Sequence, residues 1–155
     1  MNARIFLGGL SLAAALTLTA CGGSSGGETG GTGGTAGGGA TTLSVAADAA
    51  QLKYAQTTLE ATAGQPITVN FNNPSTALPH NWVLVPQGQE DAVVTAALPA
   101  NGDATGLAGV LAAGKPITGS QETINVPAQP AGTYSFICTV PGHYQSGMKG
   151  VLTVK

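Results

Sequence analysis

The C-terminal stretch TYSFICTVPGHYQSGMKGVLTVK, residues 133–155, contains the pattern that decides the fold of this chain. Before Cys138, apolar side chains take every second position, and the same alternation returns from Met148 to the C-terminus. A period of two is typical of a strand with one buried face. The residues between Cys138 and Met148 include a Pro-Gly pair, which favours a turn. The stretch therefore predicts two strands joined by a loop.

Three shorter runs upstream alternate in the same way, and Gly, Pro or Asn residues separate them. The side chains predicted to face the core are Leu43, Val45 and Ala47, then Ile67, Val69 and Phe71, then His80, Trp82 and Leu84. Several such runs favour an all-β, Greek-key β-sandwich built from antiparallel sheets. Residues 89–98 have helical spacing and predict a short helix, whereas 101–120 predict a flap with at most one or two helical turns.

The first 41 residues differ in composition from the rest and predict an export signal followed by a tether. Residues 1–20 have a positive start and a short apolar run, which is typical of a signal peptide. Leu18-Thr-Ala-Cys21 resembles the bacterial lipoprotein processing box and predicts acylation of Cys21; an ordinary signal peptide or an uncleaved anchor helix is the alternative. Residues 21–41 are rich in Gly, Ser and Thr and predict a disordered linker, which leaves 42–155 as one domain.

Composition excludes some functions and draws attention to one thiol. Only 8% of the residues are charged and the formal net charge is -2, so there is no basic patch for nucleic acid. The chain has two cysteines. If Cys21 carries lipid, Cys138 has no disulfide partner, and a lone thiol in an exported protein requires a chemical reason.

The C-terminal loop and an upstream strand together offer such a reason. One short loop has Cys138 and Met148 at its two ends and His143 within it, so these three side chains can converge. A second histidine, His80, begins an earlier strand. Two imidazoles and a thiolate with a weak axial thioether are the ligands of a blue-copper electron-transfer site. The chain has two His, two Met and two Cys, so processing that removes Met1 and acylates Cys21 leaves one such set.

Two segments carry a resemblance to a known family. Phe136-Ile-Cys138-Thr-Val-Pro-Gly-His143, followed by Gly147-Met148-Lys-Gly-Val-Leu-Thr-Val-Lys155, resembles the copper loop and last strand of azurins. His80-Asn-Trp-Val-Leu84 is similar to their first ligand strand, and the four residues between His143 and Met148 resemble the auracyanins more closely. The resemblance implies a cupredoxin fold with one type 1 copper ion bound by His80, Cys138, His143 and Met148.

The resemblance also implies roles for neighbouring residues. Asn81, Pro79 and Thr139 would lie directly behind the ligands, with Asn81 tying its strand to the copper loop. Azurins have a glycine in place of Pro79, and no cysteine is present for their disulfide. An apolar patch around His143, on which a redox partner could dock, is predicted from four residues that flank the ligand segments: Leu78, Pro79, Pro141 and Tyr144. The alternative is that these are scattered surface residues.

These expectations define an electron carrier that is not an enzyme. The partners would be a redox donor and acceptor, for example a cytochrome, a reaction centre or a quinol-oxidising complex. The protein would be a monomer, exported and held by lipid to a membrane, facing the periplasm or the cell exterior. A copper oxidase or nitrite reductase needs further histidines, and a binuclear copper domain needs a second loop cysteine. A thiol enzyme with Cys138 as nucleophile would leave Met148 without a role. Copper storage or delivery needs faster metal exchange than a closed site with four ligands allows. A zinc site is disfavoured because a thioether is a poor zinc ligand.

Overall fold

The structure is a computed structural model that describes residues 39–155. The predicted signal peptide, Cys21 and most of the predicted linker lie outside the described residues, so these remain predictions. The first strand begins at Thr41, one residue before the predicted boundary of the domain at 42. None of the helices within residues 39–155 is long and apolar enough to cross a membrane.

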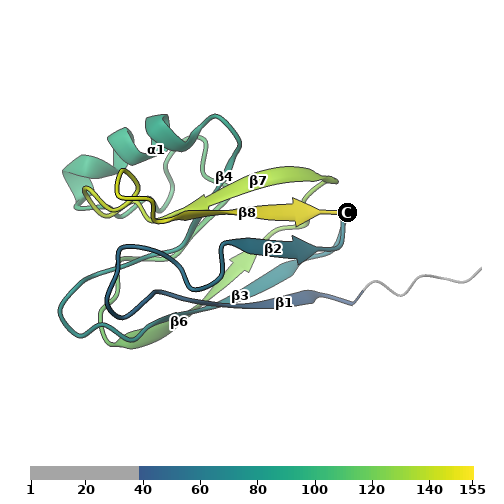
Figure 1. Ribbon diagram of the computed structural model, residues 1–155. Coiled ribbons are helices and arrows are strands. Elements are labelled where there is room, and N and C mark those ends of the chain that lie inside the picture. The colour runs from purple at the N-terminus through teal and green to yellow at the C-terminus, as the bar shows by residue number, and fades with distance from the viewer. Residues whose placement is uncertain (1–38) are drawn as a thin grey trace, which may run out of the picture. The chain divides into compact units, whose positions relative to one another are not determined.

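The domain consists of two β-sheets that face each other (Figure 1). The three-stranded sheet has the order β1 (Thr41–Ala46), β3 (Ile67–Asn73), β6 (Ser120–Val126). The five-stranded sheet has the order β2 (Thr58–Ala61), β8 (Lys149–Val154), β7 (Gly132–Ile137), β4 (Val83–Pro86), β5 (Ala112–Ala113). The predicted β-sandwich is confirmed.

Strand pairing differs from the predicted antiparallel arrangement in two places. Strand β1 runs parallel to β3, and β2 runs parallel to β8, whereas the other pairs are antiparallel. The chain leaves the first sheet after β1, contributes β2 to the second sheet and then returns to β3. Because this crossover reverses the chain twice, β1 and β3 run in the same direction.

The sequence pattern did not indicate β2 or β6. Strand β2 has only four residues, too few for a clear alternation. In β6 the inward positions are Glu122, Ile124 and Val126, so a half-buried carboxylate interrupts the apolar series. Pairing with β3 over seven residues, Ile67 to Asn73, defines this strand instead.

Aromatic side chains fill the core between the sheets. Trp82 stacks on Phe136 with ring centroids 5.7 Å apart, and Tyr54 lies against Phe136 at 5.2 Å and Phe71 at 6.2 Å. All four rings are at most 1% exposed. Fully burying a large apolar side chain contributes ~1.5–3 kcal/mol, so this cluster makes the end of the sandwich that carries His80 rigid.

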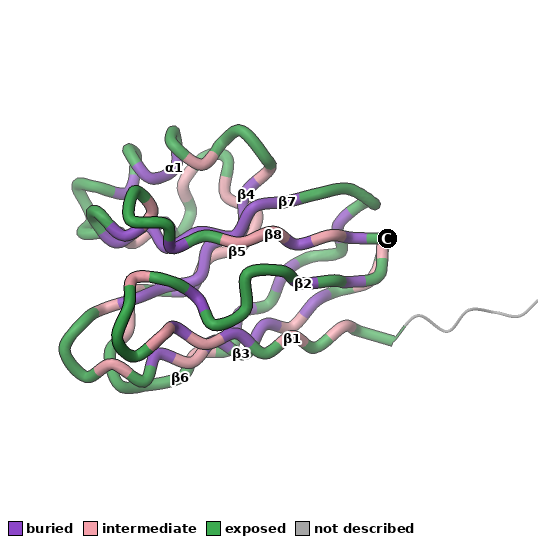
Figure 2. The backbone as a smooth tube through the Cα atoms, in the orientation of Figure 1, coloured by how far each residue is buried: buried purple, intermediate pink, exposed green. Residues whose placement is uncertain are grey.

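Helix α1 (Glu90–Ala97), continued by the short 3-10 helix η1 (Leu98–Ala100), covers the outer face of the five-stranded sheet (Figure 1). Its buried residues Val93, Val94 and Ala97 pack in a second cluster with Val83 and Val85 of β4. Strand β4 is therefore buried on both faces, and Figure 2 shows buried residues along β4 and β7. The predicted helix over 89–98 is confirmed.

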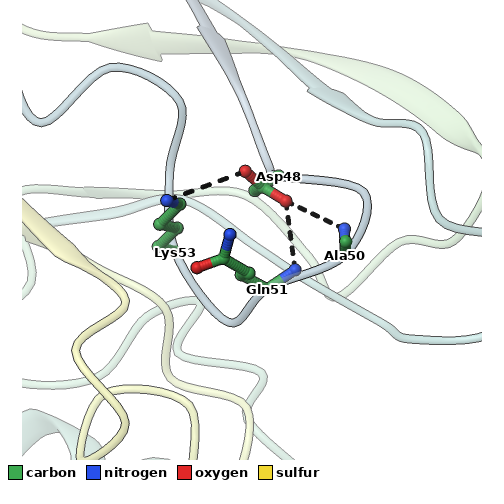
Figure 3. A network of polar contacts seen from close by, with 4 residues as sticks. All are labelled: Asp48, Ala50, Gln51 and Lys53. Atoms are coloured by element: carbon green, nitrogen blue, oxygen red, sulfur yellow. Dashed lines mark hydrogen bonds and ion pairs between the residues drawn. The ribbon is translucent and has the colours of Figure 1, made fainter.

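The connection from β1 to β2 is held by Asp48 (Figure 3). Its carboxylate accepts the backbone N–H groups of Ala50 at 2.9 Å and Gln51 at 3.1 Å, and it lies 4.0 Å from the Lys53 ammonium group. Ala47 and Tyr54 then form an isolated antiparallel bridge. The turn thereby brings the Tyr54 ring into the core.

The close approach of β8 to β7 generates a stability prediction. A Cβ atom at Gly150 would collide with the Phe136 ring and lie 2.6 Å from the Thr57 carbonyl oxygen, whereas a Cβ at Gly132 has only Tyr134 atoms at 3.7 Å and beyond. We expect Gly150→Ala to lower the free energy of unfolding by about 1–3 kcal/mol through overpacking. Gly132→Ala should stay within about 0.5 kcal/mol of wild type. Urea unfolding measures both, and equal effects would contradict the packing described here.

Candidate metal centre

The four predicted ligands are presented by one end of the sandwich. Cys138 directly follows β7, and Met148 directly precedes β8. His143 lies in the loop between these strands, and His80 precedes β4, which pairs with β7. In Figure 1 this loop lies at the end of the sheet opposite to the C-terminus and beside α1.

Three of these side chains form a compact group of donor atoms. One ligand atom each from His80, Cys138 and His143 lie within 4.8 Å of one another. Nδ1 of His80 is 3.1 Å from Nδ1 of His143, which is 3.5 Å from the Cys138 sulfur. His80 and Cys138 are fully buried, and His143 is 8% exposed. The group is thus shielded from water except on the side of His143.

Backbone hydrogen bonds tie Met148 to two of these residues. Its N–H donates to the His143 carbonyl at 3.0 Å, and its carbonyl accepts the Cys138 N–H at 3.1 Å. The Met148 side chain is fully buried in the same core cluster as Cys138. Its position relative to the other candidates is therefore set by the loop backbone.

His80 is held by a short ladder with Ile117. The two residues form an antiparallel bridge in which each N–H donates to the other's carbonyl, at 3.0 and 2.9 Å. The buried Asn73 amide donates to the carbonyls of Leu78 and Ile117, at 2.8 and 2.6 Å. The sequence alone indicates no role for Asn73 or Ile117 at the site, because neither residue belongs to a ligand segment. Pro79 itself is half-buried.

Asn81 connects the two ligand segments. Its Oδ1 accepts the Thr139 N–H at 3.0 Å, and its Nδ2 donates to the Thr139 hydroxyl at 2.9 Å. The Asn81 carbonyl in turn accepts the Tyr54 hydroxyl at 2.6 Å. Both Asn81 and Thr139 are fully buried, so these bonds are not exchanged with water. Tyr54 was not singled out from the sequence, where it lies outside any strand pattern.

Burial determines the protonation of the group. It lowers the pKa of His80 from 6.5 to about 4, with the nearby His143 acting in the same direction, and it also lowers the pKa of His143. Burial raises the pKa of the Cys138 thiol from 9.0 to about 11, although backbone N–H groups of Asn81 and Val140 directed at the sulfur oppose this. At neutral pH both rings are uncharged, and a metal that takes the thiolate must displace its proton.

The chemistry of the donors fits copper. Neutral imidazole suits both Cu(II) and Cu(I), and thiolate suits Cu(I). The Nδ1 atoms of His80 and His143 face each other at 3.1 Å. Protons on both atoms would repel each other, so at least one of the two nitrogens directs a lone pair into the group. A neutral imidazole that coordinates through Nδ1 carries its proton on Nε2, and Nε2 of His80 is buried without a hydrogen-bond partner among residues 39–155.

The residues predicted to form a docking patch differ in exposure. Leu78 is 43% exposed and Pro141 is exposed, whereas Tyr144 is half-buried. Tyr144 packs against the cluster beneath α1, and the Lys149 ammonium lies 5.1 Å from its ring centroid. Of the four predicted residues, Leu78 and Pro141 therefore offer apolar surface directly, whereas Tyr144 and Pro79 are half-buried and offer only part of theirs.

Comparisons with known proteins agree with this geometry. Residues 41–155 match the family of copper-binding proteins described as the plastocyanin/azurin family. The chain is 42% identical over 149 residues to auracyanin-A of Chloroflexus aurantiacus, covering 92% of this chain and 91% of that protein. Its fold is similar to that of dithionite-reduced auracyanin from Roseiflexus castenholzii, with a TM-score of 0.70 and 40% identity over 76% of this chain and 99% of that one. It is also similar to the structure of auracyanin A, a blue copper protein of Chloroflexus aurantiacus, with a TM-score of 0.65 and 35% identity over 76% of this chain and all of that one.

The lowered pKa of His80 predicts a pH dependence for the metal-free protein. Folding favours the neutral ring, so the unfolded chain binds more protons between about pH 6.5 and about pH 4, and stability is lost as the pH falls through this range. From pH 7 to pH 4.5 we expect the free energy of unfolding to fall by about 2 kcal/mol. His143 contributes in the same direction.

Urea unfolding of the metal-free protein at several pH values measures this slope. A His80→Gln variant, which cannot titrate here, should show a shallower slope than wild type. A wild-type stability that is constant down to about pH 4 would mean that burial does not hold this imidazole neutral.

Proposed function

The chain belongs to the plastocyanin/azurin family of copper-binding proteins, and we propose that it carries single electrons on one type 1 copper ion between redox partners at a membrane. The observation that carries this proposal is the buried group of His80, Cys138 and His143, whose donor atoms lie within 4.8 Å of one another. Members of this family bind one type 1 copper, and these residues are the site that fits it.

The proposed ligands are Nδ1 of His80, Nδ1 of His143 and the Cys138 thiolate, with the Met148 thioether as a weaker axial ligand. Copper bound by this set supplies a one-electron change between Cu(II) and Cu(I). The two imidazoles are already neutral near pH 7 because burial lowers their pKa values. Backbone N–H groups of Asn81 and Val140 directed at the Cys138 sulfur support its negative charge.

Rigidity of the ligand segments is what an electron carrier requires. Each change of oxidation state is slow if the ligands must move, so a site held in one arrangement reacts faster. Asn81 and Thr139 join the two ligand segments, and Ile117 and Asn73 hold the strand of His80. These bonds support a site that stays nearly unchanged when an electron arrives.

We further propose that electrons enter and leave through His143, the most exposed of the three clustered residues. Leu78 and Pro141, with part of Tyr144, would form the apolar surface that meets a donor or acceptor such as a cytochrome, a reaction centre or a quinol-oxidising complex. The whole chain has only two histidines, both in this site, so no further histidines are left for a catalytic copper. We therefore propose a monomeric carrier without substrate turnover.

Membrane attachment is a proposal that rests on the sequence. The Leu18-Thr-Ala-Cys21 segment supports acylation of Cys21, and the Gly-rich segment that follows would act as a flexible tether. A Gly-rich coil of about 20 residues has a root-mean-square reach of roughly 25 Å. This length would let the domain reach partners in the same membrane, on its periplasmic or exterior face.

Substitution of the sulfur ligands tests the assignment of the site. Protein loaded with Cu(II) should be strongly blue and bleach with a mild reductant, and Cys138→Ser should abolish the colour because the thiolate-to-copper transition is lost. Met148→Leu should keep the colour and raise the reduction potential, since an apolar side chain disfavours the more positive Cu(II) site. We expect at least a tenfold change in the Cu(II)/Cu(I) equilibrium, about 59 mV.

Absorption spectra and redox titration of the two variants provide the measurements. A blue Cys138→Ser protein would refute the site. A Met148→Leu protein unable to bind copper would refute the weak axial role of the thioether.

A surface substitution tests the docking patch. Electron self-exchange between two copies of the copper-loaded protein can be followed by NMR line broadening. Leu78→Lys should slow it at least about tenfold, because a charge replaces apolar contact, while leaving the potential unchanged. Thr42→Lys is the matched control: Thr42 is exposed in β1, which begins at the opposite end of the sandwich (Figure 1). Equal rates in both variants would argue against docking at Leu78.

A further inference from the structure

The backbone carbonyl of Gly102 lies at the centre of the hydrogen bonds that join the ligand segments. It accepts the Asn81 amide at 2.9 Å and the Thr139 hydroxyl at 2.6 Å. Gly102 is buried and follows η1, and its own N–H donates to the Ala97 carbonyl of α1 at 3.0 Å. One residue therefore connects α1 to Asn81 on one ligand segment and to Thr139 on the other.

The absent side chain of Gly102 permits this connection. A Cβ atom there would lie 2.6 Å from Cα of Val140, 2.8 Å from the Val140 nitrogen and 2.9 Å from the Thr139 carbonyl oxygen. All three are backbone atoms, which cannot move aside as the end of a side chain can. Gly102 also has a φ of 90°, in the region that favours glycine. Any other residue must displace either η1 or the loop after Cys138.

Gly102 contacts residues that directly follow two of the candidate ligands in the chain. Asn81 directly follows His80, and Thr139 and Val140 directly follow Cys138. Gly102 holds the side chain of Asn81 through a hydrogen bond and packs against the Val140 backbone. A shift of Gly102 would thus move the backbone next to His80 and the backbone next to Cys138. The sequence alone places Gly102 in a flap far from every ligand.

We propose that Gly102 is a positioning residue of the metal centre, through which helix α1 holds together the segments that follow His80 and Cys138. This inference rests on the proposed copper site for its spectroscopic consequences. Its structural part, that Gly102 keeps the Asn81–Thr139 link closed, applies to the metal-free protein as well. The two parts can therefore be tested separately.

Gly106 provides a matched control within the same flap. It has a φ of 76°, so Gly106→Ala carries a similar backbone strain, but no atom outside its immediate neighbours lies within 4 Å of the position of its Cβ. Gly102→Ala adds the collision with the loop to the same strain. A difference between the two variants therefore reports the contact and not the loss of glycine.

The first measurement uses metal-free protein. The Thr139 N–H donates to Asn81 Oδ1 at 3.0 Å, so its hydrogen exchange reports whether the link is closed. Under conditions where both variants are folded, we expect Gly102→Ala to exchange this amide at least about fivefold faster than Gly106→Ala, corresponding to the loss of about one hydrogen bond. Equal exchange in the two variants would overturn the proposal.

The second measurement uses protein loaded with Cu(II). Gly102→Ala should shift the thiolate-to-copper absorption band and the reduction potential, because the backbone next to Cys138 moves, while Gly106→Ala should keep the wild-type values. A Gly102→Ala spectrum and potential identical to wild type would overturn the proposal. Failure of wild-type protein to become blue would instead overturn the proposed function, and the exchange result would still decide the structural part.

If Gly102→Ala does not fold, Thr139 supplies the test from the other side. Thr139→Val removes the hydroxyl that donates to the Gly102 carbonyl, and Thr139→Ser keeps it. We expect the Val variant to exchange the Gly102 amide faster and to shift the absorption band, and the Ser variant to restore both. A Gly102 amide that exchanges at the same rate in both variants would show that its anchoring is independent of the loop, which overturns the proposal.

Discussion

The structure of the centre depends on one buried side chain, the amide of Asn81, and on the partners that it binds. Asn81 and Thr139 are 58 positions apart in the chain, and their reciprocal hydrogen bonds join the two ligand segments just beyond the paired strands β4 and β7. Since both residues are fully buried, an unmatched donor or acceptor there costs ~1–3 kcal/mol. Any rearrangement of the loop after Cys138 must break several of these bonds together, which holds the loop in one conformation.

The same burial that protects the site makes it unfavourable for charge. Both imidazoles are held neutral, and the thiol is held protonated until something replaces its proton. A metal cation would resolve this conflict, because it would attract the thiolate and could use a ring lone pair that already faces into the group. The metal-free site is therefore energetically unfavourable, and the rest of the fold must stabilise it. The aromatic core beneath the site, formed by Trp82, Phe136 and Tyr54, makes it rigid.

Helix α1 links the outer layer of the fold to the chemistry. It packs on β4 and β7 through Val93, Val94 and Ala97, and its C-terminal end continues into η1 and Gly102. The position of the helix is thereby transmitted to the loop backbone at Val140. On the opposite side, the Asp48 turn delivers Tyr54 to the Asn81 carbonyl. Two connections that contribute no candidate ligand thus determine where Asn81 lies.

The sequence by itself determined the strands β7 and β8 that flank the ligand loop, because the period of two is a local property visible around Phe136 and Leu152. It also determined the candidate ligands, since Cys138, His143 and Met148 lie within one short loop and few other residues of those types exist. Only the tertiary structure decided the parallel pairs β1–β3 and β2–β8, the strands β2 and β6, and the roles of Asn73, Tyr54 and Gly102. The physical reason is that these features depend on contacts between segments distant in the chain, which leave no periodic pattern in the sequence, and on a backbone carbonyl, which every residue possesses.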